Sequence, residues 1–325
     1  MSKALGLFSG GLDSTLAAMV LKRQGVDVTG VSFVTPFFNS AKAEKSARSI
    51  DIPLIIKDIS EIHLEVLKNP RYGYGKNMNP CIDCHALMFR LANEILQREG
   101  FDFLFSGEVL GQRPMSQNRT ALQTVAKHSG VGNLILRPLS AKLLPATPME
   151  EAGLVDREQL LDIQGRTRRR QEELAREWGI QDYPTAGGGC LLTEKSFTGR
   201  LRDLLEKQPD ATVTDIELLK VGRQFRLSKS VKLSLGRNQS DNQALKNLLR
   251  TSDVLLRVVG FSGPFGVCSG QLTEDDLVTA SGIVAAYGKG KDEAQVKVLA
   301  TQGDQNWEIE VEPMERDQAL SYQVD

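Results

Sequence analysis

Short apolar runs alternate with longer amphipathic stretches through the first half of the chain. The stretches have the hydrophobic spacing of helices, and the runs have the length and composition of β-strands, at residues 4–8, 28–34, 54–57, 103–105 and 134–136. Strands separated by helices predict βαβ units, which build a parallel sheet with helices on both faces. We therefore predict an α/β fold with a doubly wound parallel sheet, whose ligands bind at the carboxyl ends of the strands.

The pattern changes after residue 190, where helices become fewer. Short strands separated by turns are predicted at residues 217–220, 223–227, 231–235, 254–259, 294–299 and 307–311. This texture predicts a second, smaller α+β domain, with the boundary near residues 191–198. We divide the chain into domains at 1–195 and 196–325, and we expect the polar tail 312–325 to be loose.

Composition narrows the class of protein. The 325 residues are 41% hydrophobic and 25% charged, which is ordinary for a globular protein. The first residues show neither a long apolar core nor a cleavage site, so we expect a cytoplasmic protein that does not enter a membrane. Four cysteines in such a chain favour metal or redox chemistry over a disulfide framework. Because the net charge is −1, a nucleic acid would have to bind a local basic face.

A glycine-rich turn follows the first predicted strand and precedes a predicted helix at 15–22. Its residues are Ser9, Gly10, Gly11, Leu12, Asp13 and Ser14. The two glycines allow backbone amides to approach phosphate oxygens, the serines add hydroxyl donors, and the helix N-terminus favours an anion. Asp13 is expected to bind Mg²⁺ or to orient these donors. The pattern indicates a pyrophosphate site, although a Gly-Ser turn that only caps a helix has the same composition.

At these residues the chain resembles the PP-loop ATP pyrophosphatases of the adenine nucleotide α-hydrolase (HUP-like) superfamily. The resemblance implies that ATP is cleaved between its α and β phosphates, and that a carbonyl oxygen is adenylated before nitrogen or sulfur displaces AMP. It also implies that the backbone at Phe33 lies beside the adenine. The sequence lacks the GxxxxGK[ST] pattern of a Walker A loop, so transfer of the γ-phosphate is not expected.

Three cysteines are candidates for metal or redox chemistry. Cys81 and Cys84 open a predicted helix that runs to about residue 98, and Cys190 follows the glycines at 187–189. A 4Fe-4S cluster would use all three and leave one iron open for exogenous sulfide. A dithiol or persulfide pair needs only Cys81 and Cys84, and a zinc site would add His85. Cys268 is expected to be a core residue at a strand edge, and inert buried thiols remain a fourth interpretation.

Two further segments resemble tRNA thiolation enzymes. Asn79 to Cys84 is similar to their PxPCxxC loop, and Arg137 to Leu139 matches an RPL-type segment. Gly107, Glu108, Gly111 and Gln112 fit the GDxxGQ pattern of ThiI-type 4-thiouridine synthases, with Glu in place of Asp. The resemblance places these four residues in the nucleotide crevice. THUMP and rhodanese-like segments are not recognisable, so the chain is most similar to the shorter, iron-sulfur TtuI-type 4-thiouridine synthetases.

Basic residues gather in two places. The segment 196–250 carries a clear excess of Lys and Arg over Asp and Glu, which suits phosphate binding. Residues 221–227 and 235–242 resemble the NFACT-R RNA-associated domain. The RNA-binding candidates are Arg223, Arg226 and Arg237 in this segment, and Arg166, Arg168, Arg169 and Arg170 in the first domain. The alternative is that these side chains only solvate the surface.

The resemblances together imply a cytoplasmic, ATP-dependent tRNA sulfurtransferase. Its implied cofactors are ATP, Mg²⁺ and a 4Fe-4S cluster. Its implied partners are tRNA and either sulfide or a persulfide donor. Its implied products are 4-thiouridine at position eight of the tRNA, AMP and pyrophosphate. The implied catalytic residues are Asp13, Cys81, Cys84 and Cys190. The alternatives are a tRNA 2-thiouridylase, a small-molecule PP-loop ligase, or a non-catalytic RNA-binding quality-control protein. The sequence leaves the oligomeric state open, a homodimer included, and no histidine falls in an acid-base constellation.

Overall fold

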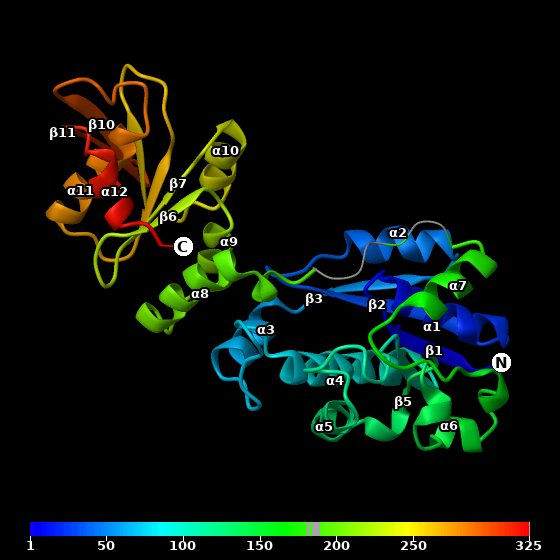
Figure 1. The fold of residues 1–325 in the computed structure, drawn as a ribbon. Helices are drawn as coiled ribbons and strands as arrows, with labels where there is room; N and C mark the ends of the chain where they lie inside the picture. The colour runs from blue at the N-terminus through cyan, green and yellow to red at the C-terminus, as the bar shows by residue number, and fades with distance from the viewer. Residues whose placement is uncertain (181–182, 184–188, 325) are drawn as a thin grey trace. The chain divides into compact units, whose positions relative to one another are not determined.

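The computed structural model describes residues 1–180, 183 and 189–324. The chain forms two compact units, Met1–Thr193 and Glu194–Asp325 (Figure 1). Each unit has its own sheet and its own hydrophobic core.

The first unit is built on a five-stranded parallel sheet. Its strands are β1 (Lys3–Leu7), β2 (Asp27–Val34), β3 (Leu54–Asp58), β4 (Phe103–Ser106) and β5 (Ile135–Leu136). They lie in the order β3-β2-β1-β4-β5, and every neighbouring pair is parallel. This confirms the predicted doubly wound sheet. The strand order reverses between β1 and β4, so a crevice opens there at the carboxyl ends of the strands.

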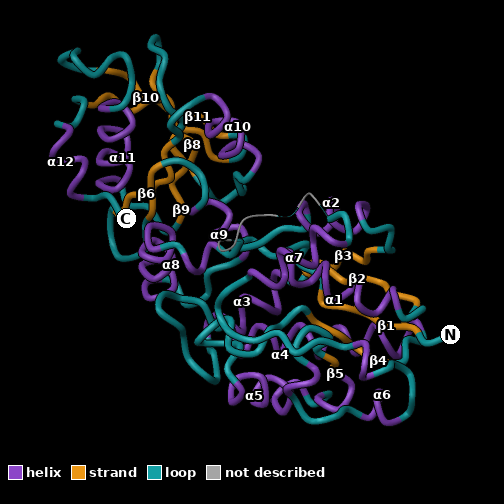
Figure 2. The backbone as a smooth tube through the Cα atoms, turned by 45° about the vertical axis from the view of Figure 1, so that its right-hand side comes forward, coloured by secondary structure: helices purple, strands orange, loops and turns teal. Residues whose placement is uncertain are grey.

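Helices cover both faces of this sheet. They are α1 (Leu12–Arg23), α2 (Ala41–Ser49), α3 (Ser60–Lys68), α4 (Cys81–Glu99), α5 (Arg119–Ser129), α6 (Pro148–Glu151) and α7 (Arg169–Glu177). Figures 1 and 2 show α1, α2 and α7 on one face and α3, α4 and α5 on the other. The strands alternate accordingly: Phe105 faces α1, and Leu104 faces α4.

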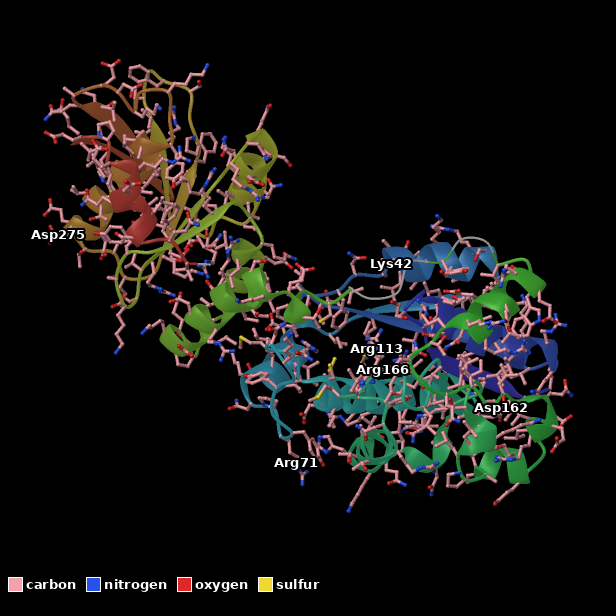
Figure 3. The ribbon with its side chains drawn as sticks, in the orientation of Figure 1. Lys42, Arg71, Arg113, Asp162, Arg166 and Asp275 are labelled. Carbon is pink, nitrogen blue, oxygen red and sulfur yellow. The ribbon has the colours of Figure 1, made fainter. Side chains whose placement is uncertain are left out.

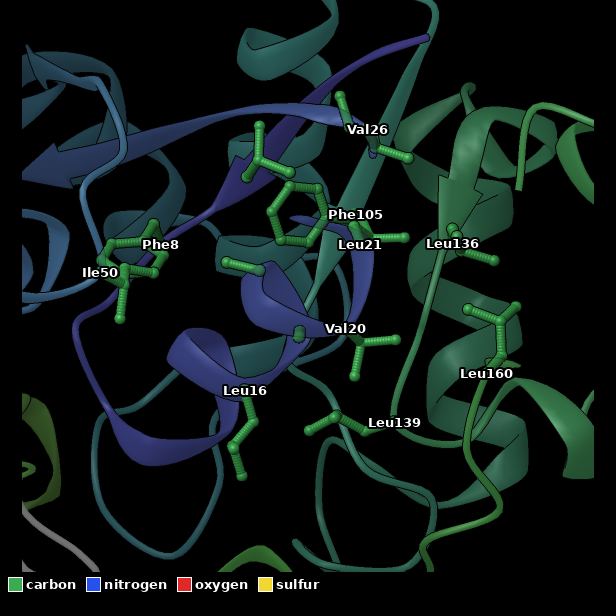
Figure 4. Packing of buried hydrophobic residues seen from close by; sticks show 14 of the residues in the cluster. Phe8, Leu16, Val20, Leu21, Val26, Ile50, Phe105, Leu136, Leu139 and Leu160 are labelled. Carbon is green, nitrogen blue, oxygen red and sulfur yellow. The ribbon is translucent and has the colours of Figure 1, made fainter. Parts of the chain in front are cut away.

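Close packing around β1 explains why residue 6 is a glycine. Phe105 on β4 is fully buried, and a Cβ at Gly6 on the neighbouring strand would overlap its ring. Figure 4 shows Phe105 and Phe8 among the side chains that pack against α1. Full burial of such a side chain stabilises the fold by roughly 1.5–3 kcal/mol, so this packing fixes β1 against β4 and α1.

The second unit combines helices with a six-stranded antiparallel sheet. Its strands are β6 (Arg223–Arg226), β7 (Lys232–Leu235), β8 (Val254–Val258), β9 (Gly266–Ser269), β10 (Val296–Gln302) and β11 (Gln305–Val311), in the order β11-β10-β8-β9-β7-β6. The helices are α8 (Lys195–Lys207), α9 (Val213–Leu219), α10 (Gln239–Asn247), α11 (Glu274–Ala286) and α12 (Arg316–Ser321). The buried side of α11 packs on the sheet, which gives the predicted α+β architecture.

Three predictions for the second unit were wrong in detail. Residues 217–220 lie in and directly after helix α9, because Thr212 and Asp215 form a capping box that starts a helix there. The strand that carries Cys268 is interior, between β8 and β7, although the thiol itself is a fully buried core residue as expected. The tail is packed rather than loose: it forms α12, and the Val324 amide donates to the Gln224 carbonyl at 2.9 Å.

Within the part of the chain that the structure describes, helices long and apolar enough to cross a membrane are absent.

Candidate active site

The glycine-rich turn joins β1 to α1 at the carboxyl edge of the first sheet. Gly10 has a φ of 70°, the left-handed region that favours glycine, and a Cβ there would overlap the carbonyl of Lys42. The Ser46 hydroxyl, on the same helix α2, donates to the Gly10 carbonyl at 2.9 Å. The turn is therefore held tightly against the start of α2, and only glycine fits at position 10.

The start of α1 is open toward the crevice. Gly11 is the N-cap residue, and no side chain caps the helix. The hydroxyls of Ser14 and Thr15 instead donate to the Gly11 carbonyl, at 2.9 and 3.0 Å. A Cβ at Gly11 would meet only the Ser9 Oγ, at 3.4 Å. The first amides of α1 have no intrahelical acceptor, and their position suits an anion such as pyrophosphate.

The loop after β4 packs directly on this turn. A Cβ at Gly107 would overlap the backbone of Ser14, so the two segments touch. At the other end of the loop, the Gln112 Nε2 donates to the Asp13 Oδ2 at 2.8 Å, and the Gln171 amide donates to Gln112 at 3.1 Å. The structure thus brings Gly107 and Gln112 to the glycine-rich turn.

Asp13 is the charged centre of this contact. Its Oδ2 accepts from Gln112 and lies 3.7 Å from an Arg168 guanidinium nitrogen. Its Oδ1 is buried and has no hydrogen-bond partner among the described residues. A buried, unpaired carboxylate oxygen next to open helix amides fits a site for Mg²⁺ with bound phosphates. Arg168 therefore lies at the turn rather than in an outward-facing patch.

Glu108 sits at the centre of a buried network. One carboxylate oxygen accepts from Arg137 Nε at 2.9 Å and from the Ser106 hydroxyl at 3.1 Å, and the other lies 2.9 Å from His85 Nδ1. Burial alone would raise the pKa of Glu108, but Arg137 and His85 outweigh it and lower the pKa to about 2. Glu108 is therefore ionised and pairs with a buried arginine.

Replacing this carboxylate is expected to destabilise the first unit. Glu108→Gln leaves Arg137 buried without its counter-charge, which costs about 3 kcal/mol of unfolding free energy. Because the folded pKa lies below the usual 4.5, the natural protein should also lose stability as pH falls from 4.5 toward about 2, and the variant should lack this component. Urea unfolding in a Trp307→Phe background measures this, since Trp178 then reports on the first unit alone.

The exposed Glu61 on α3 provides the control for that measurement. Glu61→Gln removes a carboxylate from the same unit without touching a buried cation, and it should change the unfolding free energy by less than about 0.5 kcal/mol. Equal effects of the two substitutions would show that the Glu108 network contributes nothing special.

The histidines divide into three different environments. His85 belongs to the Glu108 network, which the sequence analysis did not anticipate. His128 lies 3.6 Å from Asp83, whose carboxylate also accepts from the amides of Arg71 and Tyr72. His63 is fully buried against the ring of Phe38, and burial lowers its pKa to about 4, so it is a neutral core residue.

Cys81 and Cys84 lie in the first turn of α4. A loop before the helix supports them: the Asn79 side-chain amide donates to the Cys81 Sγ at 3.2 Å. A Cβ at Gly75 would overlap the Asn79 side chain, so glycine is needed for the loop to close. The loop thus fixes the position of the Cys81 sulfur at the start of the helix.

The Cys190 segment is attached beside the same loop. The Leu191 amide donates to the Phe37 carbonyl at 3.0 Å, and the Asn77 side chain donates to the Thr193 carbonyl at 2.7 Å. The pKa of the Cys84 thiol is raised well above its usual value, first by burial and then by charge on Cys190, Cys81 and Asp83. Thiols that influence one another in this way lie in one neighbourhood.

The three thiols are all reduced. Among the described residues, no three His, Cys, Asp or Glu side chains lie close enough together to hold a metal ion. Cys81, Cys84 and Cys190 come from two segments of the first unit, and one of the three sulfurs accepts a hydrogen bond from Asn79. Of the glycines before Cys190, Gly187 and Gly188 lie outside the described residues.

The remaining candidate residues lie on several elements of the two units. Phe33 on β2 is buried, with its side chain in the core. Gly111, with a φ of 77°, packs against Gly165, and the exposed Arg166 follows in that same loop (Figure 3). The other candidates have these positions: Arg169 and Arg170 pair with Glu173, Arg226 pairs with Asp203 on α8, Arg237 pairs with Asp241, and Arg223 lies over the ring of Tyr287.

These features define an α/β unit with a PP-loop at the carboxyl edge of its parallel sheet, followed by an α+β unit. Comparison with family models agrees with both parts. Residues 1–142 match the model described as Thiamine biosynthesis protein (ThiI), and residues 222–323 match the NFACT protein RNA binding domain. The chain is thus similar to ThiI over its first 142 residues and to the NFACT RNA-binding domain over residues 222–323, the two resemblances that the sequence patterns indicated.

Individual relatives are enzymes of tRNA modification by name. The chain is 35% identical over 121 residues to the tRNA-specific 2-thiouridylase MnmA of Sulfurimonas denitrificans, and 28% identical over 143 residues to a probable tRNA sulfurtransferase of Thermoanaerobacter. These matches cover 34% and 42% of this chain, and it spans 36% of the length of each relative. A solved 4-thiouridine synthetase–RNA complex with bound ATP aligns at 22% identity with a TM-score of 0.39, over 67% of this chain and 52% of the other.

Proposed function

We propose that this protein is an ATP-dependent tRNA sulfurtransferase that converts a uridine, at position eight of tRNA, to 4-thiouridine. One observation carries the proposal: the loop from Gly107 to Gln112 contacts the PP-loop at both of its ends, and Glu108 within it also contacts the cysteine-bearing helix α4. Gln112 binds Asp13, and Glu108 binds His85, which directly follows Cys84. The nucleotide site and the thiols thus belong to one connected site.

The expected reaction has two steps, and the PP-loop serves the first. The open amides of α1 and the hydroxyls of Ser9 and Ser14 would hold the β- and γ-phosphates, and Asp13 would hold Mg²⁺. The uracil O4 attacks the α-phosphorus, an O–P bond forms, and pyrophosphate leaves. AMP attached to O4 is then a good leaving group.

The thiols serve the second step. A 4Fe-4S cluster held by Cys81, Cys84 and Cys190 would supply an iron without a protein ligand, to which sulfide can bind. Hydrosulfide attacks C4 of the uracil, the C–O bond breaks, and AMP departs with the original oxygen. The uracil loses its N3 proton when O4 is adenylated and regains a proton at N3 as the sulfur proton leaves, so the product has a C=S group and no electron transfer is required. The buried Glu108–His85 contact would keep α4 in place beside the nucleotide during this step.

Purified protein reconstituted anaerobically with iron and sulfide tests the proposal. With unmodified tRNA and ATP, we expect AMP, pyrophosphate and 4-thiouridine in equal amounts, measured by nucleotide chromatography and by nucleoside mass spectrometry. Formation of ADP instead of AMP would contradict the proposal, and so would tRNA-independent release of pyrophosphate at the full rate.

The identity to 2-thiouridylases makes O2 thiolation the second candidate. The two thiouridines have the same mass, but they separate by chromatographic retention against standards. Digestion of the product tRNA with a base-specific nuclease locates the modified position. A 2-thiouridine product would leave the sulfurtransferase chemistry in place and move the attack from O4 to O2.

A further inference from the structure

The second unit contains a basic cavity that nothing in the thiolation chemistry uses. Its volume is about 590 Å³. Five cationic side chains line it and no carboxylate does; they are Arg223, Arg237, Lys289, Lys291 and Arg316. They come from β6, from the turn before α10, from the loop after α11 and from the start of α12. Residues distant in sequence thus converge on one cavity.

The charge in this cavity is only partly compensated. Arg237 pairs with Asp241 at 2.8 Å. Within the described residues, Arg223, Lys289, Lys291 and Arg316 form no ion pair with a carboxylate. Cations held close together repel one another unless an anion joins them, so the cavity is a site for negative charge.

Tyr287 organises two of these cations. Its ring lies 4.8 Å from the guanidinium carbon of Arg223 and 5.1 Å from that of Arg316. A guanidinium stacked on a ring keeps its N–H edge available for bidentate donation to phosphate. The Tyr287 hydroxyl is buried and has no hydrogen-bond partner among the described residues, so the ring contributes to the cavity through its stacking on the two guanidinium groups.

The start of α10 adds backbone donors to the same cavity. Asn238 caps the helix, and Gln239, its first residue, lines the cavity. Asn242 on the next turn accepts from the Phe265 amide at 3.0 Å, which fixes the turn at Gly263 and Pro264. That turn also lines the cavity, so a hydrogen-bonded backbone turn forms part of its frame.

A second cavity of about 510 Å³ lies on the other side of this turn. The two cavities share Asn242 and residues 262–264. The second is lined by Lys246, Arg257 and the ring of Phe261, which is 39% exposed. A cationic cavity next to an exposed aromatic ring suits a nucleotide strand, in which a phosphate and the neighbouring base bind separately.

We infer that these adjoining cavities bind the RNA substrate, with a phosphate between Arg223, Lys289, Lys291 and Arg316 and a neighbouring base on Phe261. The inference rests on the proposed function for the identity of the RNA. The group that binds between the cations is a phosphate of the RNA. It is either the phosphate monoester at the end of the strand or a phosphodiester inside it.

The test measures the affinity of the full chain for tRNA by fluorescence anisotropy at several salt concentrations. The double variant Lys289→Glu/Lys291→Glu should bind at least about tenfold more weakly at about 0.1 M salt, and the slope of log K against log salt should fall by about two. Lys207→Glu/Lys229→Glu is the matched control: it changes two exposed lysines of the same unit and the same net charge, and it should retain most of the affinity.

Two further comparisons complete the test. Phe261→Ala should weaken binding about tenfold without changing the salt slope, whereas Val278→Ala, which removes another exposed apolar side chain of this unit, should not. If RNA with a 5′-monophosphate binds more tightly than RNA with a 5′-hydroxyl, the bound group is the terminal phosphate. If the two RNAs bind equally, the bound group is an internal phosphodiester. Equal losses in the cavity and control variants overturn the inference. Pyrophosphate release by the natural protein decides the proposed function independently.

Discussion

Gly10→Ala is expected to reduce tRNA-dependent pyrophosphate release at least about a hundredfold. The new Cβ would have to occupy the space of the Lys42 carbonyl while the residue keeps a φ of 70°. The residue can keep this φ and avoid the carbonyl only if the turn moves away from α2. A displacement of about 1 Å in a segment that positions phosphate lowers the rate roughly a hundredfold. Release of pyrophosphate under saturating tRNA measures the effect.

Gly25→Ala is the matched control for Gly10→Ala. Gly25 follows the other end of α1 and has a similar φ of 79°, but an added Cβ would meet nothing within 4 Å. Its replacement should cost about 1 kcal/mol of stability and leave the rate unchanged. A Gly10→Ala variant with normal activity would mean that the turn does not position the nucleotide.

Cys81→Ala is expected to abolish thiouridine formation while adenylation continues. The substitution removes the sulfur that accepts a hydrogen bond from Asn79, and it leaves the PP-loop and the Glu108 network untouched. Pyrophosphate should therefore still be released in the presence of tRNA, whereas the tRNA should contain no thiouridine. Iron and acid-labile sulfide in the reconstituted protein, about four of each per chain in the natural protein, should also be lost.

Cys268→Ala separates this effect from the general loss of a thiol. Cys268 is fully buried between two strands of the second unit, and its replacement should lower stability slightly without changing iron content or thiouridine yield. Full iron content in Cys81→Ala would exclude that residue as a cluster ligand, and full thiouridine yield would exclude it from sulfur transfer.

The sheet of the first unit could be predicted because its signals are local. Each strand is a short apolar run between amphipathic helices, and the alternation of Leu104 with Phe103 and Phe105 puts side chains on both covered faces. The second unit was harder. Residues 217–220 look like a short apolar strand, and the competing signal was the capping box of Thr212 and Asp215 a few residues earlier.

The candidate site was predictable only where a motif is contiguous. The PP-loop and the Cys81–Cys84 pair stand in single segments, so their chemistry is visible in the sequence. The hydrogen-bond partners of Asp13 and Glu108 are not visible in the sequence. Gln112 lies 99 residues from Asp13, and His85 lies 23 residues from Glu108 on another element, so both contacts depend on how the helices pack on the sheet.

The C-terminal tail shows that amino-acid composition alone does not predict whether a segment is packed. Residues 312–325 are polar, yet Ala319 is fully buried and Val324 extends the edge of the sheet beside Gln224. The amide of Arg226 also donates to the Tyr322 carbonyl at 2.8 Å, and the side chains of Met314 and Tyr322 pack against the core, so several contacts dock this short helix once a sheet edge is available. Neither the edge nor its position can be read from the tail itself.

The beginning of α1 has no capping side chain. The helix starts after Gly11, at a position where serine, threonine or aspartate would accept from the first amides. The acceptors for these amides must therefore come from solvent or from a bound anion. Because the neighbouring Gly10 is held against α2, the turn presents these donors in a fixed arrangement before any anion arrives.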